Sequence, residues 1–378
     1  MDNALIEKEF PQQEGLIYLN HAGVAPVPAR TASAVEGFIR ESVRVGAVFH
    51  EQWRAKEREL REQCRRFINA ASANDIALLK NTSEGISIVA CGLDWLEGDN
   101  VVTSNEEFPS NRVPWEAQSR HGVTTRQVDL RVDDPEAALM AACNNDTRVL
   151  AISSVEYSSG LRLDLARLGE YCRKHGILFC VDAIQSLGAI DFNVQDIQAD
   201  FIMADDHKWL LGPEGIALFY CRGELLESLM LNQYGWHMVE DYGNFDRQDW
   251  EPAASARRFE CGTANMLGIH AFSASLTLFE DIGMAGVQRR LLDNSGYLIE
   301  RLKAVNGVTI VTPEAESRRA GIVVFKVEGK DNKKIFSELV KNNVICAHRG
   351  GGIRFSPHFY TPGEQLDQAV ELVSELSR

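Results

Sequence analysis

The sequence contains no Cys-x-x-Cys pair, no basic cluster and no long apolar run, and each absence excludes a class of protein. Eight cysteines scattered singly through 378 residues predict reduced thiols, not a disulfide framework or a zinc site. A net charge of −15 without dense lysine and arginine argues against nucleic-acid or anionic-membrane partners. No stretch of about 18 apolar residues offers a membrane span, and the acidic N-terminus does not resemble a signal peptide. We therefore expect a cytoplasmic protein that binds neither nucleic acid nor membrane.

The composition and the alternation of short apolar runs predict a large α/β domain. Hydrophobic residues make up 45% of the chain and charged residues 25%, which is enough for a full-sized core. After a helix at 28–68, β-branched apolar runs alternate with helix-length segments such as 165–175, which is typical of crossover units and a mainly parallel sheet. The predicted strands are 76–79, 101–103, 124–128, 149–153, 177–181, 201–204 and 216–220. Ligands bind outside the carboxyl ends of such strands.

The last part of the chain has a different pattern. The alternation stops at about 223–262, which we expect to be a long surface loop with a function or an interface. A long helical region follows at 266–305. The remaining predicted elements are strands near 309–311, 322–327, 344–347 and 353–356 and a helix at 363–376. These elements predict a smaller α+β domain.

The length of the chain is typical of two domains. We expect a large domain at 16–262 and a small domain formed by 1–15 and 263–378. No Gly-x-Gly-x-x-Gly follows the first strand, which argues against a dinucleotide-dependent dehydrogenase.

Two predicted strand ends carry a lysine and an aspartate. Lys208 follows the apolar run 201–203 and precedes a Gly-Pro turn, so its ammonium is poorly hydrated and its pKa should fall, as a Schiff-base nucleophile requires. Asp182 ends another apolar strand. Pyridoxal 5'-phosphate needs one amine for its aldehyde and one carboxylate for its pyridine nitrogen. Taken singly, these residues are also explained as a surface lysine and a helix cap; together they predict a pyridoxal phosphate site.

Side chains suited to the rest of this cofactor lie near other predicted strand ends. Thr82 and Ser83 open an apolar helix whose free N–H groups suit a phosphate, although the same pattern is a common helix cap. Phe108 is a candidate to stack on the cofactor ring, or else a core aromatic. Gln185 is a candidate partner of the phenolic oxygen, or a polar turn residue. His207 is a candidate contact of phosphate or substrate, or a core histidine.

Arg354 is a candidate for binding a substrate carboxylate, because guanidinium geometry suits two parallel hydrogen bonds. The alternative is a surface ion pair. Thr263 lies just after the predicted loop, and the residues alone assign it no role.

Five segments resemble the motifs of one enzyme family. They are 18–23 (YLNHAG), 181–188 (VDAIQSLG), 207–215 (HKWLLGPEG), 258–263 (RFECGT) and 353–360 (IRFSPHFY). Nearly end to end, the chain resembles the class V aminotransferase family of fold-type I pyridoxal phosphate enzymes, which includes cysteine desulfurases, kynureninases and isopenicillin N epimerase-like proteins. The resemblance implies a seven-stranded, mainly parallel sheet flanked by helices, with a smaller α+β domain.

The resemblance also implies roles for the cofactor-binding residues. Lys208 would carry the cofactor as a Schiff base, Asp182 would pair with the pyridinium, and Gln185 would contact the phenolic oxygen. The helix start at Thr82 and Ser83 would bind the phosphate. The aromatic ring at 108 stands where desulfurases stack a histidine and kynureninase-like enzymes a phenylalanine.

Substrate and partner follow from the same resemblance. Arg354 would bind the α-carboxylate of a small-molecule amino acid substrate, and Asn20 and His21 would line the substrate pocket. Thr263 would reach the phosphate in the neighbouring subunit, which implies a homodimer with shared active sites.

Two departures from the desulfurase pattern matter. Asp205 and Asp206 stand where desulfurases have Ser-Gly. Because a carboxylate and a phosphate in contact repel, Asp205 must point elsewhere, or other donors hold the phosphate. The mobile catalytic cysteine is also not evident: Cys346 lies on a predicted buried strand, where a thiol stays protonated.

The predicted site labilises Cα–H, with the freed Lys208 amine as general base. We rank an aminotransferase first, a β-lyase (C–S lyase or desulfurase-like) second and an epimerase third. Epimerisation needs a second acid on the opposite ring face, for which His21 and His237 are candidates. A catalytically silent pyridoxal-fold binding protein is the remaining alternative, and the presence of both Lys208 and Asp182 argues against it.

Overall fold

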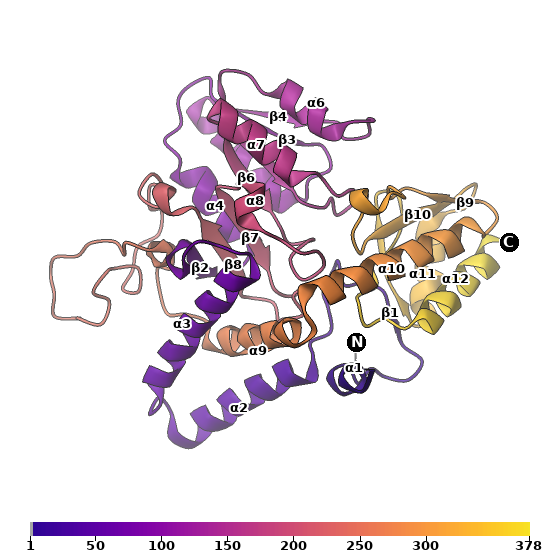
Figure 1. The fold of residues 1–378 in the computed structure, drawn as a ribbon, viewed down its shortest axis with the longest axis horizontal. Helices are drawn as coiled ribbons and strands as arrows, with labels where there is room; N and C mark the ends of the chain where they lie inside the picture. The colour runs from indigo at the N-terminus through magenta and orange to yellow at the C-terminus, as the bar shows by residue number, and fades with distance from the viewer. Residues whose placement is uncertain (1–2) are drawn as a thin grey trace.

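The computed structural model describes residues 3–378 and is built on a seven-stranded sheet (Figure 1). Its strand order is β2-β8-β7-β6-β5-β3-β4. The strands are β2 (Ile76–Leu79), β3 (Asn100–Ser104), β4 (Thr124–Val128), β5 (Thr147–Ser153), β6 (Leu178–Asp182), β7 (Phe201–Asp205) and β8 (Ala217–Cys221). Each coincides with a predicted strand to within two residues at either end. β4, β3, β5, β6 and β7 pair in parallel, whereas β8 is antiparallel to β7 and β2. The predicted α/β class and mainly parallel sheet are confirmed.

Alternate residues of the central strands belong to two separate cores, one on each face of the sheet. Along β5, Leu150 and Ile152 pack in the core that includes helices α3 (His50–Phe67), α7 (Leu165–His175) and α9 (Met266–Ile282). Val149 and Ala151 pack in the other core, with α4 (Thr82–Gly92) and α5 (Val113–Glu116). Both faces are therefore covered, which explains why the strands are continuous apolar runs.

The helix predicted at 28–68 is two helices, and that prediction is wrong. α2 (Ala29–Val45) ends at Gly46, whose φ of +58° suits a residue without a side chain, and α3 begins at His50. The helical region predicted at 266–305 is likewise divided at Gly283 into α9 and α10 (Met284–Lys303). α7 spans the predicted 165–175, between a capping Asp164 and a left-handed Gly176.

A smaller four-stranded antiparallel sheet lies at the other end of the molecule (Figure 1). Its order is β12-β13-β10-β9, and β11 pairs with β1 in a separate two-stranded sheet. The bounds of these elements are β1 (Ile17–Tyr18), β9 (Val308–Ile310), β10 (Val323–Val327), β11 (Val344–Ile345), β12 (Ala347–Arg349), β13 (Gly352–Phe355), α11 (Asn332–Lys341) and α12 (Gly363–Ser377). The division into domains at 16 and 263 stays a prediction, and residues 1 and 2 lie outside the described part of the chain.

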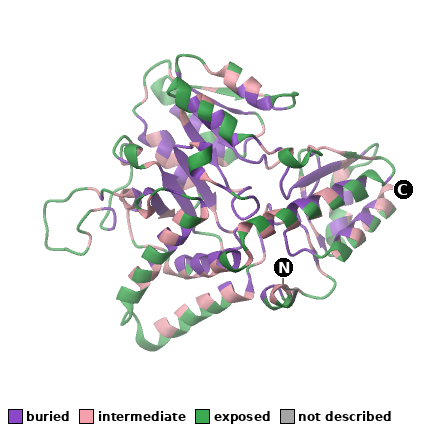
Figure 2. Ribbon diagram, viewed as in Figure 1, coloured by how far each residue is buried: buried purple, intermediate pink, exposed green. Residues whose placement is uncertain are grey.

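The remaining helices are short, and they are α1 (Asn3–Glu9), α6 (Pro135–Ala142) and α8 (Val194–Ile197). The predicted loop at 223–262 is present, with the 3₁₀ turns Gly223–Leu225 and Ala256–Phe259 near its ends. In Figure 1 part of it projects away from the body, and Figure 2 shows that part mainly exposed. Among residues 3–378, no helix combines the length and apolarity that a membrane crossing requires.

Candidate active site

The carboxyl ends of neighbouring strands bring most of the predicted residues to one cavity of about 280 Å³. Ser153, Asp182 and Asp205 are the last residues of β5, β6 and β7, and Lys208 follows three positions later. The cavity is lined by Ala22, Gly23, Val24, Thr82, Ser83, Phe108, Ser110, Ser153, Tyr157, Asp182, Ile184, Gln185, Asp205, His207, Lys208, Arg349 and Arg354. This edge of a parallel sheet is the usual ligand site.

The Lys208 amine is unpaired, and its side chain is half-buried. The structure records no hydrogen bond or ion pair to its Nζ from the described residues, and its nearest ring is Phe108, whose centroid lies 5.8 Å away. Burial lowers the pKa of Lys208 to about 8, although the charge of Asp182 opposes the shift. The turn that follows is strained, because Leu211 adopts a φ of +62°. These properties suit an amine that reacts with a carbonyl group.

Asp182 is a buried carboxylate with one oxygen still available. Its Oδ1 accepts the N–H of Ile184 at 3.0 Å, and Oδ2 has no hydrogen-bond partner among the described residues. Burial raises the pKa of Asp182 to about 6, against the effect of the Lys208 charge. A cationic ring N–H placed against Oδ2 would favour the ionised form.

Gln185 is fixed between two segments of the chain. Its Oε1 accepts the indole N–H of Trp209 at 2.7 Å, and its Nε2 donates to the carbonyl of Ala22 at 3.2 Å. Gly188 allows this approach: its φ is +87°, and a Cβ there would lie 2.2 Å from the Trp209 carbonyl oxygen. The segment after β6 is therefore packed directly against the segment that carries Lys208.

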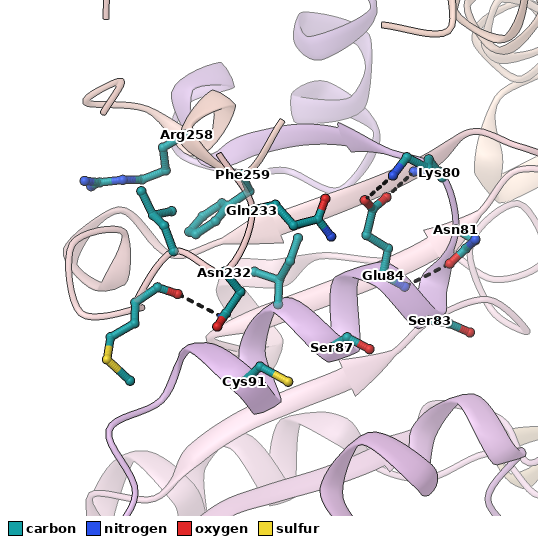
Figure 3. Close-up of a pocket in the computed structure, with 13 residues that line it drawn as sticks. Lys80, Asn81, Ser83, Glu84, Ser87, Cys91, Asn232, Gln233, Arg258 and Phe259 are labelled. Carbon is teal, nitrogen blue, oxygen red and sulfur yellow. Dashed lines mark hydrogen bonds and ion pairs between the residues drawn. The ribbon is translucent and has the colours of Figure 1, made fainter. Parts of the chain in front are cut away.

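The start of α4 forms another side of the cavity. Asn81 caps the helix, and its side-chain oxygen accepts the N–H of Glu84 at 2.8 Å (Figure 3). The Asp205 carboxylate also points into this helix start, where it accepts hydrogen bonds from the N–H and the hydroxyl of Thr82. The expectation that Asp205 points elsewhere is therefore wrong. That other donors hold the phosphate stays a prediction.

Phe108 is the exposed wall of the cavity, with 43% of its surface accessible. Its ring makes an edge contact with Tyr157, with centroids 5.2 Å apart. A solvent-facing phenyl ring beside an unpaired amine fits a stacking role better than a core role.

Arg354 is buried on β13 and only partly satisfied. Its Nη1 donates to the Tyr157 carbonyl at 3.0 Å, its Nη2 lies 3.5 Å from Asn20 Oδ1, and its Nε has no partner. Burial, and then the charge of Arg349, lower the pKa of Arg354 to about 10. Arg349 and Arg354 both line the cavity, and guanidinium groups are suited to hydrogen-bond a carboxylate.

Three predicted positions do not line this cavity. Asn20 contacts two lining residues, Arg354 and Gly23, without lining the cavity itself. His21 is buried with its ring nitrogens bonded to the Ser356 carbonyl at 2.8 Å and the Tyr360 hydroxyl at 2.6 Å. Thr263 lines two other cavities. Their assigned roles stay predictions.

Asp206 faces away from the cavity into the protein. It is fully buried, and its carboxylate oxygens have no partner among the described residues. Burial raises the pKa of Asp206 well above its usual range. The turn depends on Gly212, because a Cβ there would lie 1.8 Å from Asp206 Oδ2. Asp206 is therefore a packing feature of the turn that carries Lys208.

Four polar residues that line the cavity were not among the predicted site residues: Ser110, Ser153, Tyr157 and Arg349. Ser153 ends a predicted strand, so its position at the cavity could have been predicted in the same way as that of Asp182. Arg349 carries no such signal, because it enters from the β12–β13 hairpin, where it pairs with Gly352.

A second cavity of about 420 Å³ lies along α4 (Figure 3). Its lining includes Ser83, Ser87 and Cys91 from the helix. The one lysine among its lining residues, Lys80, is exposed and paired with Glu84, with 3.0 Å between Nζ and Oε1. This cavity lacks the free amine of the Lys208 cavity.

Comparison with known proteins identifies the family. The model of the family "Aminotransferase class-V" matches residues 17–367. The chain belongs to the class V aminotransferase family. It is 29% identical to a probable cysteine desulfurase of Methanothermobacter thermautotrophicus, over 98% of this chain and 97% of that protein. It is 30% identical to a cysteine desulfurase of Klebsiella pneumoniae strain 342, over 82% of this chain and 78% of that protein.

Two solved structures share the fold. The apo cysteine desulfurase of Thermococcus onnurineus NA1 superimposes with a TM-score of 0.86 at 24% identity, over 98% of this chain and 97% of that one. The cystine C–S lyase C-DES, in complex with its product cysteine persulfide, superimposes with a TM-score of 0.90 at 23% identity, over 97% of this chain and 99% of that one. Both comparisons confirm the predicted fold.

Family membership confirms pyridoxal phosphate as the cofactor, and the residues present fit it. Lys208 supplies an unpaired, half-buried amine, Asp182 a free carboxylate oxygen, and Phe108 an exposed ring on the same cavity. These are the groups that the aldehyde, the ring nitrogen and the ring face require.

Proposed function

We propose that this chain is a pyridoxal phosphate-dependent lyase that cleaves the Cβ–S bond of a sulfur-containing amino acid. The observation that carries the proposal is the Lys208 cavity, which combines a free amine with two guanidinium groups and contains no cysteine among its lining residues. The named relatives, which are cysteine desulfurases, support a sulfur-containing substrate.

Each side chain then has a definite task. Arg354, with its unpartnered Nε, holds the α-carboxylate, and Arg349 adds a second positive charge beside it. The bound cofactor supplies an electron sink that acidifies the Cα–H bond. Lys208 Nζ, displaced by the substrate amine, accepts the Cα proton, and its pKa of about 8 suits a base near neutral pH.

The sulfur leaves with the electron pair of the Cβ–S bond. Hydrolysis of the remaining three-carbon unit gives pyruvate and ammonia. The sulfur fragment is released as sulfide from cysteine, as a thiol from a cysteine S-conjugate and as a persulfide from cystine. No cysteine lines the Lys208 cavity among the described residues. Cys346 is 6% exposed, and burial raises its pKa to about 12. This favours elimination into solvent over transfer of sulfur to the protein.

The other reactions have weaker support. Transamination, ranked first from the sequence, receives none from the named relatives. Epimerisation needs an acid opposite Lys208, and neither His21 nor His237 lines the cavity. Retention of the unpaired amine and of Asp182 argues against a silent binding protein.

A homodimer is part of the proposal. Thr263 lies outside the Lys208 cavity of its own chain, on a cavity that also involves Trp236 and Phe245. Both aromatic rings are exposed in the single chain, as expected of a surface that a second copy covers. An active monomer in size-exclusion chromatography would refute the shared site.

The reaction is tested by incubating the cofactor-loaded protein with cystine, cysteine, a cysteine S-conjugate and alanine. We expect pyruvate, ammonia and the sulfur product in equal amounts from a sulfur amino acid, without any added keto acid. Product formation that requires a keto acid acceptor would show a transaminase instead. If the protein turns over none of the three sulfur-containing amino acids, the proposal is contradicted.

A matched variant separates elimination from desulfuration. Cys346→Ser should leave the rate within about twofold, because a buried protonated thiol takes no part. If the folded C346S protein no longer releases sulfur, the thiol is the acceptor and the chain acts as a desulfurase.

A further inference from the structure

Asp205, the last residue of β7, is bonded to the start of α4 through both its side chain and its backbone. Its Oδ1 accepts hydrogen bonds from the Thr82 N–H and, at 3.0 Å, from the Thr82 hydroxyl. Its own N–H donates to Thr82 Oγ1 at 3.1 Å. The second carboxylate oxygen lies 3.2 Å from Nδ1 of His207. A negative charge is thus held at the positive end of the helix dipole, which is also where a phosphate binds best.

Few donors of this helix start remain for a phosphate. Asn81 accepts from the third and fourth helical N–H groups, and Asp205 accepts from the first, at Thr82. Among the described residues, the Ser83 N–H has no partner, and the Ser83 hydroxyl donates to the hydroxyl of Ser110 at 2.7 Å. Both serines line the Lys208 cavity. A phosphate bound through them lies close to the Asp205 carboxylate.

We propose that Asp205 sets the affinity of this chain for its phosphorylated cofactor. Its carboxylate competes with the phosphate group of pyridoxal phosphate for the donors of α4 and lowers the affinity for that group and for free inorganic phosphate. The proposal rests on cofactor binding at Lys208, which belongs to the proposed function, but not on which substrate bond is cleaved.

The physical reason is the repulsion between two anions in a partly buried place. The Asp205 side chain is only 12% exposed, so solvent screens its charge poorly. A serine here, as in the desulfurase pattern, donates a hydrogen bond to a phosphate; an aspartate repels it. Pyridoxal, which lacks the phosphate, reacts with the same lysine and escapes the repulsion. The ratio of the two affinities therefore isolates the effect of Asp205.

The test titrates the cofactor-free protein with pyridoxal phosphate and, separately, with pyridoxal, and follows the visible absorbance of the lysine-bound form. Asp205→Asn keeps an oxygen for Thr82 and removes the charge, and Asp205→Ser restores the desulfurase residue. In both variants we expect pyridoxal phosphate to bind about tenfold tighter and pyridoxal to change by less than about twofold. Inorganic phosphate should raise the melting temperature of the variants and not that of the parent.

Asp331→Ser is the matched control, because Asp331 caps α11 and accepts the N–H groups of Lys333 and Lys334 at 3.0 and 3.3 Å. D331S should lower the melting temperature and leave both cofactor affinities unchanged. An unchanged affinity ratio in D205N and D205S would overturn the proposal and make Asp205 a structural link between β7 and α4. A changed ratio without any lyase activity would refute the proposed reaction and leave this inference standing.

Discussion

The Lys208 cavity and the cluster around Arg61 both bring together groups of opposite charge. They differ in whether the same chain supplies a partner for each of these groups. Arg61 Nη1 lies 2.7 Å from Glu57 and its Nη2 lies 2.7 Å from Glu260. The His237 nitrogens lie 3.5 and 3.6 Å from the same two carboxylates. Glu260 also accepts the N–H of Leu78. In this cluster each carboxylate has a cation of the same chain beside it.

The Lys208 cavity lacks that completeness. Its amine has no hydrogen bond or ion pair among the described residues, and one oxygen of Asp182 accepts no hydrogen bond from them. These two groups make the difference, because Arg61 and Arg354 each have an Nε without a partner. Buried charges without partners are costly, and they persist where a ligand completes them. The geometry of Glu57, His237 and Glu260 also suits a metal ion, but Arg61 already holds both carboxylates. The comparison separates a structural charge cluster from a ligand site.

The largest effect is expected for a substitution of Lys208 itself. Lys208→Ala should lower the lyase rate by at least about 10²–10⁴-fold, because the general base is lost together with the covalent attachment of the cofactor. The melting temperature of the cofactor-free protein should not fall, since Nζ makes no bond in the folded chain. Residual turnover near the parent rate would assign the chemistry to another base.

The Arg61 cluster should respond in the opposite way, with a loss of stability and no loss of turnover. Arg61→Met leaves Glu57 and Glu260 buried without their cation, which should cost about 3–5 kcal/mol of unfolding free energy in urea titrations. The turnover of the molecules that remain folded should be unchanged. Arg40→Met, which removes the exposed ion pair with Glu36, is the control and should change stability by about 0.5 kcal/mol or less. If R61M and R40M changed the unfolding free energy equally, the conclusion that Arg61 neutralises the two buried carboxylates would be contradicted.

A carboxyl pair beside the Lys208 cavity extends the comparison, because no residue in the described part of the chain forms an ion pair with it. Glu107 accepts hydrogen bonds from the N–H and the hydroxyl of Ser153 at 2.7 and 2.6 Å, and Glu156 accepts one from Ser104 at 2.7 Å. Burial raises the pKa of Glu107 from 4.5 to about 7, although hydrogen bonds from Ser153 and Asn111 oppose the shift. Burial, and then the charge of Glu107, raise the pKa of Glu156 as well.

A raised folded-state pKa means that the stabilising contribution is complete below pH 4.5 and is lost as the pH rises through about 7. The parent should therefore lose about 3 kcal/mol of unfolding free energy over this range through Glu107. In Glu107→Gln this part of the pH dependence should disappear. Parallel stability curves for parent and variant would show that Glu107 ionises freely in the folded protein.

The smallest effect is expected for a substitution that keeps the charge of the Lys208 cavity. Arg354→Lys loses the planar fork and should raise KM for the amino acid about tenfold while kcat changes by less than about twofold. Arg319→Lys is the matched control, because Arg319 is buried with bonds to the Glu314 carbonyl and the Ser295 hydroxyl, outside the cavity. R319K should alter stability and not KM. A kcat loss without a KM change in R354K would remove Arg354 from carboxylate binding.

The sequence predicted the strands of the large sheet well, because all of them except β4 are short runs of mainly buried residues. It predicted Lys208, Asp182, Gln185 and Phe108 on one cavity, because strand ends meet at one edge of a parallel sheet. The break at Gly46 was missed, since the polar and apolar pattern continues through it. Arg349 was missed because only the tertiary structure brings its hairpin to the large sheet.

The orientation of Asp205 was also beyond the sequence. Charge repulsion predicts that the Asp205 carboxylate avoids a phosphate. In the folded chain, however, this carboxylate accepts a hydrogen bond from the Thr82 N–H at the start of α4. Local hydrogen bonding at a helix start thus decides the position of a side chain that the motif alone leaves open.

The central claim is that Lys208, and no other lysine, carries the cofactor. Borohydride reduction of the loaded protein, followed by proteolysis and mass spectrometry, should find the reduced cofactor on Lys208 and none on Lys80, whose amine is exposed and paired with Glu84. Label on Lys80 or on another lysine, with Lys208 unmodified, would contradict the account.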